Sequence, residues 1–232
     1  MSNPKVLVFT DFDGTVSTAD TGNVIVDRFM GPERRKALDT QVLDGVTSYR
    51  DAVREQWKSV KASLEHAMDL LSAVEIDPDF PEFHSYCIQH KIPVTVVSSG
   101  LRPIVEAFMK DYSESEHGGL FDIVANDISI DADAGWDIIY RDETPHGHDK
   151  SLTLRTITER YLSADTAQRP VVVFVGDGIS DISAAREADV IFAKSGKDLE
   201  TWCQRENVPF IAWDRFGIVL AHLKQIVAAQ RA

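Results

Sequence analysis

The stretch KVLVFTDFDGTVSTAD, from Lys5 to Asp20, joins a hydrophobic run to two closely spaced aspartates. The run ends at Thr10, and its unbroken apolar residues are typical of a strand that is buried on both faces of a parallel sheet. Asp11 and Asp13 follow directly, and residues two apart on an extended chain point to the same side. The sequence therefore predicts a strand whose carboxyl end places two carboxylates in one site.

Four further apolar runs predict strands, and helical patterns lie between them. The strand candidates are residues 92–97, 122–126, 171–175 and 189–193, and the helical segments include 102–112 and 151–162. Alternating strands and helices predict an α/β fold with a Rossmann-like, three-layer parallel sheet and right-handed crossovers. Two β-like arms around Ala134 and Gly135, over residues 128–143, predict a hairpin.

One segment interrupts this alternation. Residues 17–80 contain no convincing strand and resemble several amphipathic helices, such as SYRDAVREQWKSV and SLEHAMDLLSAV. We therefore expect a small all-helical cap over residues 17–80, inserted into a catalytic core formed by residues 1–16 and 81–232.

Composition narrows the class of protein. The 232-residue chain has a formal net charge of −13, which argues against nucleic-acid binding because that function normally needs a basic patch. No stretch approaches the ~20 apolar residues of a membrane span, so we expect a soluble, cytoplasmic protein that binds no membrane. Cys87 and Cys203 form no CxxC pair, and we expect buried or idle thiols. The oligomeric state is not predicted.

Polar clusters follow three of the predicted strands. They are DFDGT after the first strand, SSG at residues 98–100 and GDGISD at residues 176–181, and GHDKS at residues 147–151 opens a helix. Ligands of open α/β sheets bind beyond the carboxyl ends of the strands. The four clusters are therefore expected to meet in one site.

The carboxylates of this site predict a metal. Asp177 and Asp181 are expected to converge on Asp11 and Asp13, and so many carboxylates repel one another unless a cation lies among them. A set of oxygen ligands that shares a phosphate suits Mg²⁺. We therefore expect Mg²⁺ as the cofactor.

The same residues suit phosphoryl transfer. A carboxylate such as that of Asp11 is a competent nucleophile towards phosphorus. Asp13 is placed to protonate the leaving oxygen and then to activate water. Lys150 supplies positive charge, and Ser98 with nearby backbone N–H groups supplies donors for the phosphoryl oxygens.

In this order DFDGT, VVSSG, Lys150 and GDGISD resemble the four motifs of the haloacid dehalogenase superfamily of phosphatases, and the helical insert resembles its type 1 cap, as in phosphoserine phosphatases. The resemblance implies that Asp11 is the nucleophile and forms an aspartyl-phosphate, and that Asp13 is the general acid and base. It assigns Ser98 and Lys150 to the phosphoryl group.

The same resemblance assigns the metal ligands. It places Mg²⁺ on Asp11, on the Asp13 carbonyl and on Asp177. It gives Asp181 the role of supporting the waters of the metal or orienting Lys150. The partner that it implies is a small-molecule phosphate ester.

A narrower resemblance concerns the substrate. TDFDGTV, IIYRDETPHGHDKS, GDGISDISAA and FAKSGKDL resemble fungal polyol-phosphate phosphatases, which act on esters such as glycerol 3-phosphate and sorbitol 6-phosphate. The alternative is phosphoserine. Asp20 and Gln56 align with the cap residues that bind the amine and carboxylate of phosphoserine, and Gln56 stands where an arginine is expected. Polyol phosphates are therefore favoured, with Ser99 and Gly100 also predicted to bind substrate.

Other interpretations are less consistent with the sequence. His146 and His148 have a spacing compatible with zinc, but no third ligand is evident, which favours a loop that positions Lys150. A phospho-acceptor module of the response-regulator kind lacks a helical cap. A catalytically inactive metabolite-binding relative would be expected to lack part of the motif set, which is complete here.

Overall fold

The computed structural model describes residues 4–112, 119–162 and 169–230. Its centre is one seven-stranded sheet in the order β4-β3-β2-β1-β5-β6-β7. All neighbouring strands are parallel except β3 and β4, which form an antiparallel hairpin. The strands are β1 (Val6–Thr10), β2 (Val94–Leu101), β3 (Phe121–Ile130), β4 (Trp136–Ile139), β5 (Val171–Gly176), β6 (Val190–Lys194) and β7 (Ile211–Trp213).

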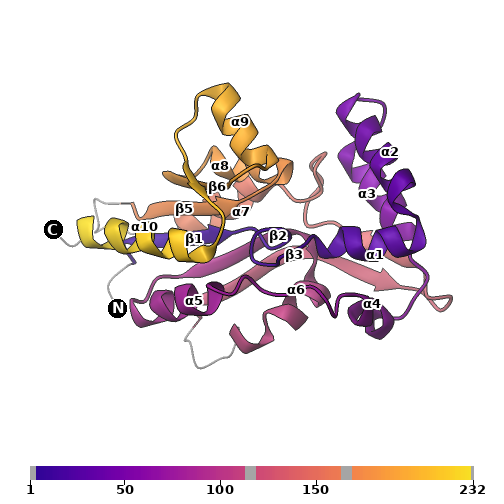
Figure 1. Ribbon diagram of the computed structural model, residues 1–232, viewed down its shortest axis with the longest axis horizontal. Coiled ribbons are helices and arrows are strands. Elements are labelled where there is room, and N and C mark those ends of the chain that lie inside the picture. The colour runs from indigo at the N-terminus through magenta and orange to yellow at the C-terminus, as the bar shows by residue number, and fades with distance from the viewer. Residues whose placement is uncertain (1–3, 113–118, 163–168, 231–232) are drawn as a thin grey trace.

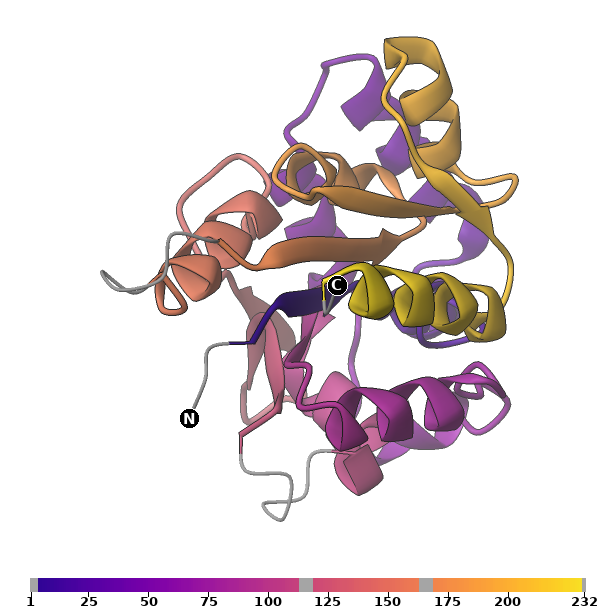
Figure 2. The ribbon, with the colours of Figure 1, turned by 90° about the vertical axis from the view of Figure 1, so that its left-hand side faces the viewer.

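Helices cover both faces of this sheet, which confirms the predicted three-layer α/β fold (Figure 2). One face packs against α5, α6 and α10, and the other against α7, α8 and α9. The core helices are α5 (Phe80–Gln89), α6 (Arg102–Phe108), α7 (Lys150–Glu159), α8 (Ile182–Ala185), α9 (Asp198–Glu206) and α10 (Phe216–Ala229), with 3-10 turns at Lys110–Tyr112 and Ile179–Asp181.

The apolar runs form strands because both of their faces are covered. Alternate residues of β1, such as Val8 and Phe9, contribute to the two different core clusters. Burial of apolar side chains on both faces provides most of the favourable free energy of such a sheet. Cys87 and Cys203 are buried free thiols within these clusters, as expected.

Four helices lie between β1 and α5 and gather at one end of the sheet (Figure 1). They are α1 (Thr21–Phe29), α2 (Pro32–Leu43), α3 (Tyr49–Lys58) and α4 (Leu64–Leu70). Asp20, Ser48 and Ser63 cap α1, α3 and α4, each side chain accepting a backbone N–H three residues on. The segment returns to the core near an isolated bridge between Ser17 and Ile76.

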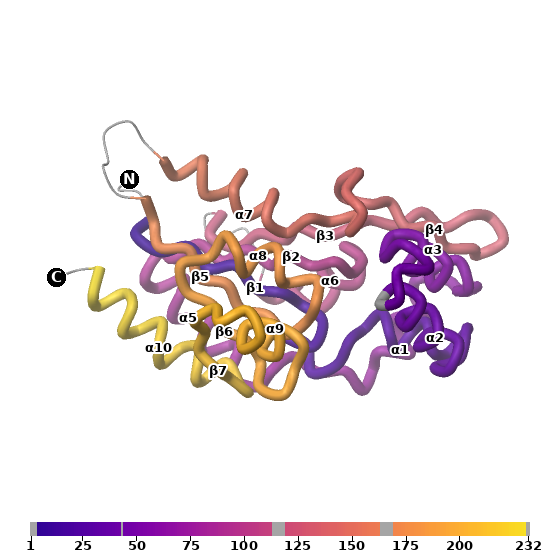
Figure 3. The backbone as a smooth tube through the Cα atoms, turned by 90° about the horizontal axis from the view of Figure 1, so that it is seen from above, coloured from indigo at the N-terminus to yellow at the C-terminus, as the bar shows by residue number. Residues whose placement is uncertain are grey.

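The β3–β4 hairpin completes the packing of these helices, so part of the core chain lies alongside α3 (Figure 3). Trp57 of α3 stacks on Trp136 of β4, with ring centroids 5.6 Å apart. The Trp136 indole N–H donates to the carbonyl of Ala62 at 2.8 Å. The predicted hairpin is thus confirmed, with Ala134 in a left-handed conformation at its turn.

Among the described residues, no helix combines the length and apolar character that crossing a membrane requires.

Candidate active site

The carboxyl ends of β1, β2 and β5 meet at the edge of the sheet that faces the inserted helices. Thr10 pairs with Val96 of β2 and Val175 of β5. The Asp11 N–H donates to the Val175 carbonyl at 2.9 Å, so Asp11 still belongs to the ordered end of β1. The register therefore brings together the aspartates after β1, residues 98–100 in the last part of β2 and the loop after β5. The strand predicted to end at Val97 continues to Leu101, so the SSG cluster belongs to the strand itself.

Lys150 lies between two carboxylates at the centre of the site. Its Nζ is 2.6 Å from an oxygen of Asp11 and 2.6 Å from an oxygen of Asp181. Lys150 and Asp181 are completely buried. Burial alone would lower the pKa of Lys150, but the charges of Asp11 and Asp181 outweigh that effect and raise it. Lys150 therefore stays charged, and its position is fixed by the first turn of α7, which Asp149 caps.

Asp181 uses both of its oxygens. While one contacts Lys150, the other accepts the backbone N–H groups of Asp177 and Gly178, each at 2.9 Å. These bonds hold the loop after β5 against Lys150. The arrangement fits the predicted role of Asp181 in orienting Lys150, and it leaves Asp11 and Asp177 as the carboxylates with freer oxygens.

Asp11, Asp177 and Asp181 form an acidic cluster in which one oxygen of each lies within 4.8 Å of the others. Burial raises the pKa of Asp11 well above its usual range, and burial with the charge of Asp181 raises the pKa of Asp177 to about 7. Lys150 offsets only part of the repulsion among three carboxylates. The donor set is entirely oxygen, which fits Mg²⁺.

Gly14 allows this cluster to be compact. Its φ is +72°, and a Cβ at this position would lie 2.5 Å from a carboxylate oxygen of Asp177. A side chain at residue 14 would therefore displace Asp177 as well as strain the backbone.

Asp13 lies beside the cluster, and its two carboxyl oxygens have different surroundings: Thr21 binds one and Gly100 lies close to the other. Its Oδ1 accepts the backbone N–H of Thr21 at 2.8 Å and the Thr21 hydroxyl at 2.6 Å. Its Oδ2 lies so close to Gly100 that a Cβ there would come within 2.6 Å. Burial, assisted by the charge of Asp20, raises the pKa of Asp13 to about 7.

Ser98 and its neighbours form the end of β2. Ser98 is completely buried, and its hydroxyl oxygen accepts the Gly100 N–H at 2.9 Å. The Ser99 carbonyl accepts the side-chain amide of Asn126 at 2.8 Å. This segment is thus held from two sides next to Asp13.

His148 contacts the backbone of Ser98. The sequence does not predict this contact. Its Nδ1 lies 2.7 Å from the Ser98 carbonyl, and its Nε2 lies 3.0 Å from the Thr153 hydroxyl. Because a carbonyl only accepts, Nδ1 carries the proton and Nε2 accepts from Thr153. Burial lowers the pKa of His148 to about 4. His148 is therefore a neutral structural residue, in agreement with the loop interpretation.

This burial makes the stability of the protein depend on pH through His148. The imidazole has a pKa of about 6.5 in an unfolded chain and about 4 in the fold, so between these values the unfolded state binds the extra proton. We expect the contribution of His148 to be complete above pH 6.5 and to fall by about 3 kcal/mol as the pH decreases to 4.

Urea unfolding of wild type and His148→Gln across this range measures the effect, since the difference between them removes the titration of other groups. The matched control is His146→Gln, because His146 lies in the same loop but is exposed. An unfolding free-energy difference between wild type and His148→Gln that stays constant with pH would contradict the expectation.

The inserted helices bring further polar groups to this edge of the sheet. Asp20 is exposed and caps α1, whereas Gln56 is buried and donates to Asp39 at 2.9 Å. Sequence reasoning missed Tyr49, the first residue of α3. Burial raises the pKa of its phenol, and the charges of Asp20, Lys150 and Asp11 also act on it. No sequence signal marks Tyr49, because its position depends on how α3 packs.

Comparison with known proteins agrees with this geometry. Residues 8–186 match the model of the haloacid dehalogenase-like hydrolases. The matched range includes Asp11, Lys150 and Asp181 of the site. The chain belongs to the haloacid dehalogenase-like hydrolase family.

Individual relatives extend over nearly the whole chain. It is 39% identical over 231 residues to polyol phosphate phosphatase PYP1 of Saccharomyces cerevisiae, covering 98% of this chain and 96% of the relative. It is also 39% identical over 224 residues to Pdp3-interacting factor 1 of Schizosaccharomyces pombe, covering 96% of each. A substrate-bound phosphoserine phosphatase structure superposes with a TM-score of 0.69 at 18% identity, covering 92% of this chain and 95% of that one. This last likeness confirms the fold.

Proposed function

We propose that this chain, a phosphoric monoester hydrolase of its family, uses Mg²⁺ to hydrolyse phosphate esters of small polyols. The observation that carries the proposal is the buried Asp11–Lys150–Asp181 centre, with Asp177 completing an all-oxygen cluster. The 39% identity to a polyol phosphate phosphatase over nearly the full chain supports the substrate class.

Asp11 is the nucleophile of the proposed reaction. Its carboxylate attacks phosphorus and the bond to the ester oxygen breaks, while Asp13 gives a proton to the departing alcohol. Asp13 then removes a proton from a water molecule that attacks the aspartyl-phosphate, which releases inorganic phosphate and restores Asp11. The contacts of Asp13 support this role, since Thr21 fixes one carboxyl oxygen and leaves the other near Gly100.

The negative charge of the phosphoryl group is balanced by hydrogen-bond donors of the protein and by the bound metal ion. Lys150, the Ser98 hydroxyl and nearby backbone N–H groups hold its oxygens. Asp11, Asp177 and the Asp13 carbonyl would hold Mg²⁺, which supplies further positive charge to the phosphoryl oxygens when bound. Asp181 positions Lys150.

Residues 17–80 act as the cap in this proposal. Trp57 packs on Trp136, which supports including the β3–β4 hairpin in the cap, although the hairpin comes from the core part of the chain. Asp20, Tyr49 and Gln56 are the cap groups that we assign to the alcohol part of the substrate.

The arginines of α2 and α3 support a substrate whose alcohol part is uncharged. Each arginine of α2 and α3 already has a partner within the protein. Arg34 pairs with Glu55, Arg35 with Asp27 and Asp39, Arg50 with Glu143, and Arg54 with Asp137. Arg50 and Arg54 also lie over the ring of Tyr140. A substrate carboxylate that bound one of these four arginines would have to displace its partner, whereas hydroxyl groups can bind Asp20 and Tyr49 without a counter-charge.

We therefore expect kcat/KM for glycerol 3-phosphate and sorbitol 6-phosphate to exceed that for L-phosphoserine. A missing charged contact of this kind corresponds to ~2–4 kcal/mol, or about 30- to 1,000-fold. Comparing the three esters under identical conditions tests the preference.

Replacing Gln56 by arginine sharpens this test. Gln56→Arg should raise kcat/KM for phosphoserine and so reduce the preference for polyol phosphates. Arg34→Gln, a change on the exposed side of the cap, should leave the order of the three kcat/KM values unchanged. If wild type prefers phosphoserine, the assignment of the cap residues is wrong and the phosphoserine alternative replaces it.

A further inference from the structure

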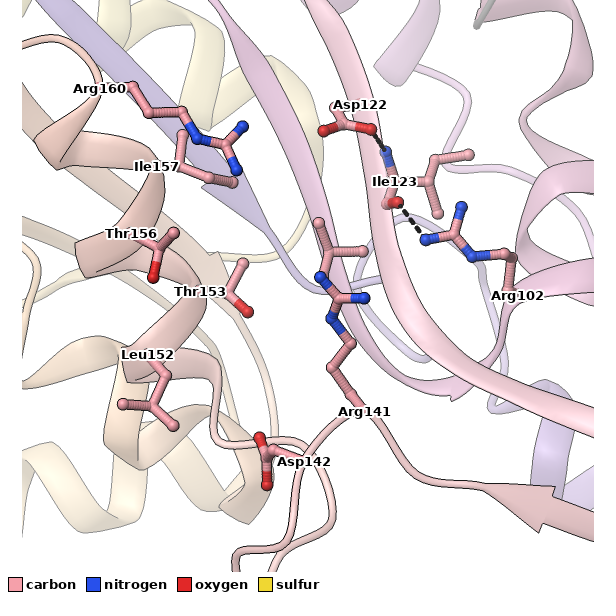
Figure 4. A pocket seen from close by; sticks show the side chains of 11 residues that line it. Arg102, Asp122, Ile123, Arg141, Asp142, Leu152, Thr153, Thr156, Ile157 and Arg160 are labelled. Atoms are coloured by element: carbon pink, nitrogen blue, oxygen red, sulfur yellow. Dashed lines mark hydrogen bonds between the residues drawn. The ribbon is translucent and has the colours of Figure 1, made fainter.

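A pocket that none of the acidic-cluster residues lines lies between α7 and β3. It has a volume of about 320 Å³. Three arginines contribute to its lining, namely Arg102 from α6, Arg141 from the loop after β4, and Arg160 at the end of α7. Figure 4 shows the guanidinium group of Arg141 extending between the α7 side chains and β3, with Arg102 and Arg160 on either side.

The fold explains why this space is left open. The apolar side of α7, with Leu154 and Ile157, packs on the sheet. Leu152, Thr156 and Arg160 are four residues apart, so they follow one another along a different side of the helix, which lines the pocket.

Two of the three guanidinium groups are free to bind a ligand. The side chains of Arg141 and Arg160 are exposed and make no hydrogen bond or ion pair with any residue in the described part of the chain. Arg102 is bound more firmly, since it donates to the Ile123 carbonyl and pairs with Glu106, both at 3.1 Å.

The two acidic residues of the pocket, Asp142 and Asp122, accept hydrogen bonds from backbone N–H groups. Asp142 accepts the backbone N–H groups of Thr144 at 2.9 Å and Asp149 at 2.7 Å, one with each oxygen. Burial would raise the pKa of Asp142, but a hydrogen bond from the Thr144 hydroxyl and these two backbone bonds outweigh burial and lower it. Asp122 accepts the Ile123 N–H at 2.8 Å. Neither carboxylate neutralises Arg141 or Arg160 by a direct ion pair among the described residues.

With three arginines and two aspartates in its lining, the pocket carries an excess of positive charge, whereas the whole chain has a formal net charge of −13. Each guanidinium fork matches one carboxylate or phosphate group, and the Thr156 hydroxyl adds a hydrogen-bond donor. We propose that this pocket is a second anion-binding site, which takes a small organic molecule with two acidic groups and acts as an effector site for catalysis.

The contacts behind the pocket support the effector role. Thr153 lines the pocket and contacts His148, which in turn contacts the Ser98 carbonyl. The backbone carbonyl of Asp142, which also lines the pocket, accepts a hydrogen bond from Arg50 of the cap at 2.7 Å. A ligand in the pocket would thus touch residues that hold both Ser98 and the cap.

Titration calorimetry of the full chain without Mg²⁺ tests the site. Succinate and methylenebisphosphonate are the two probes, and their relative affinities show whether the pocket prefers carboxylates or phosphonates. We expect saturable binding of at least one probe, weakened about tenfold or more by Arg141→Gln and by Arg160→Gln. Both side chains are exposed, so both variants should retain the thermal unfolding midpoint of wild type.

Arg155→Gln is the matched control, because Arg155 lies on the same helix outside this pocket and pairs with Glu187. It should leave probe affinity nearly unchanged. The site is refuted if neither probe binds at millimolar concentration, if the Arg141 and Arg160 variants bind as well as wild type, or if Arg155→Gln weakens binding equally.

A kinetic measurement tests the effector role separately. With Mg²⁺ in excess, a saturating concentration of the bound probe should change kcat/KM of wild type but not of Arg141→Gln. An equal change in both would assign the effect to the catalytic site, and no change in wild type would remove the effector role while leaving the anion site. The calorimetry does not depend on the proposed substrate, so the two proposals fail independently.

Discussion

Asp11→Asn is expected to lose about 10³-fold or more of kcat while keeping the native fold. The amide has nearly the same shape as the carboxylate, but it is a poor nucleophile and a weaker ligand for Mg²⁺. Because Asp11 lies 2.6 Å from Lys150, the substitution changes the catalytic centre directly. Steady-state turnover of a small phosphate ester, with circular dichroism to verify the fold, measures both parts of this expectation.

The same variant should be at least as stable as wild type in the absence of Mg²⁺. The burial of Asp11 and its repulsion by Asp181 and Asp177 raise its pKa, so the ionised carboxylate is held in the fold at a cost. Removing the charge relieves that repulsion, and Asp181 still pairs with Lys150.

Asp181→Asn provides the contrasting case. Asp181 accepts Lys150 with one oxygen and two backbone N–H groups with the other, and an amide cannot accept at both positions. This variant should be clearly destabilised.

Considerable turnover by a folded Asp11→Asn protein, or the absence of a phosphorylated intermediate in acid-quenched wild type, would rule out Asp11 as the nucleophile.

The sequence predicts the central strands and the residues near their ends because both depend on local patterns. β1, β2 and β5 each contain one of the predicted apolar runs, and their carboxyl ends carry the motifs around Asp11, Ser98 and Asp177. The parallel register then makes these residues converge. β7 is missed because its three residues, Ile211–Trp213, are too few for a periodic pattern and become a strand only by pairing with β6.

Contacts between distant parts of the chain are not predicted. The hydrogen bond from His148 to the Ser98 carbonyl joins residues that are far apart in sequence, and neither residue type predicts it. The stacking of Trp57 on Trp136 depends likewise on the hairpin reaching the cap. The engagement of Gln56 by Asp39 shows the same limit, since the sequence marks the amide but not its partner.

Removal of Mg²⁺ is expected to abolish activity completely, and addition of Mg²⁺ to restore it. Asp11 and Asp177 belong to a cluster of three carboxylates whose repulsion Lys150 only partly offsets. The phosphate of a substrate would add further negative charge to this cluster. Without a cation, approach of the substrate is therefore opposed by the carboxylates that the reaction needs. Ca²⁺ should inhibit, because it prefers more ligands and longer bonds than Mg²⁺.

Thermal unfolding gives a readout that does not depend on activity. Mg²⁺ binding to the folded state should stabilise wild type, by about 2–3 kcal/mol when its concentration is 100 times the dissociation constant. Asp177→Asn should lose most of this stabilisation because it removes one carboxylate of the cluster, whereas Asp133→Asn, in the exposed hairpin turn, should retain it. Full turnover after exhaustive chelation, or equal stabilisation of Asp177→Asn and wild type, would contradict the assignment of the cluster as the metal site. Asp181 is committed to Lys150 and to two backbone N–H groups. The loss in Asp177→Asn would therefore show that Asp177 provides a free carboxylate oxygen for the ion.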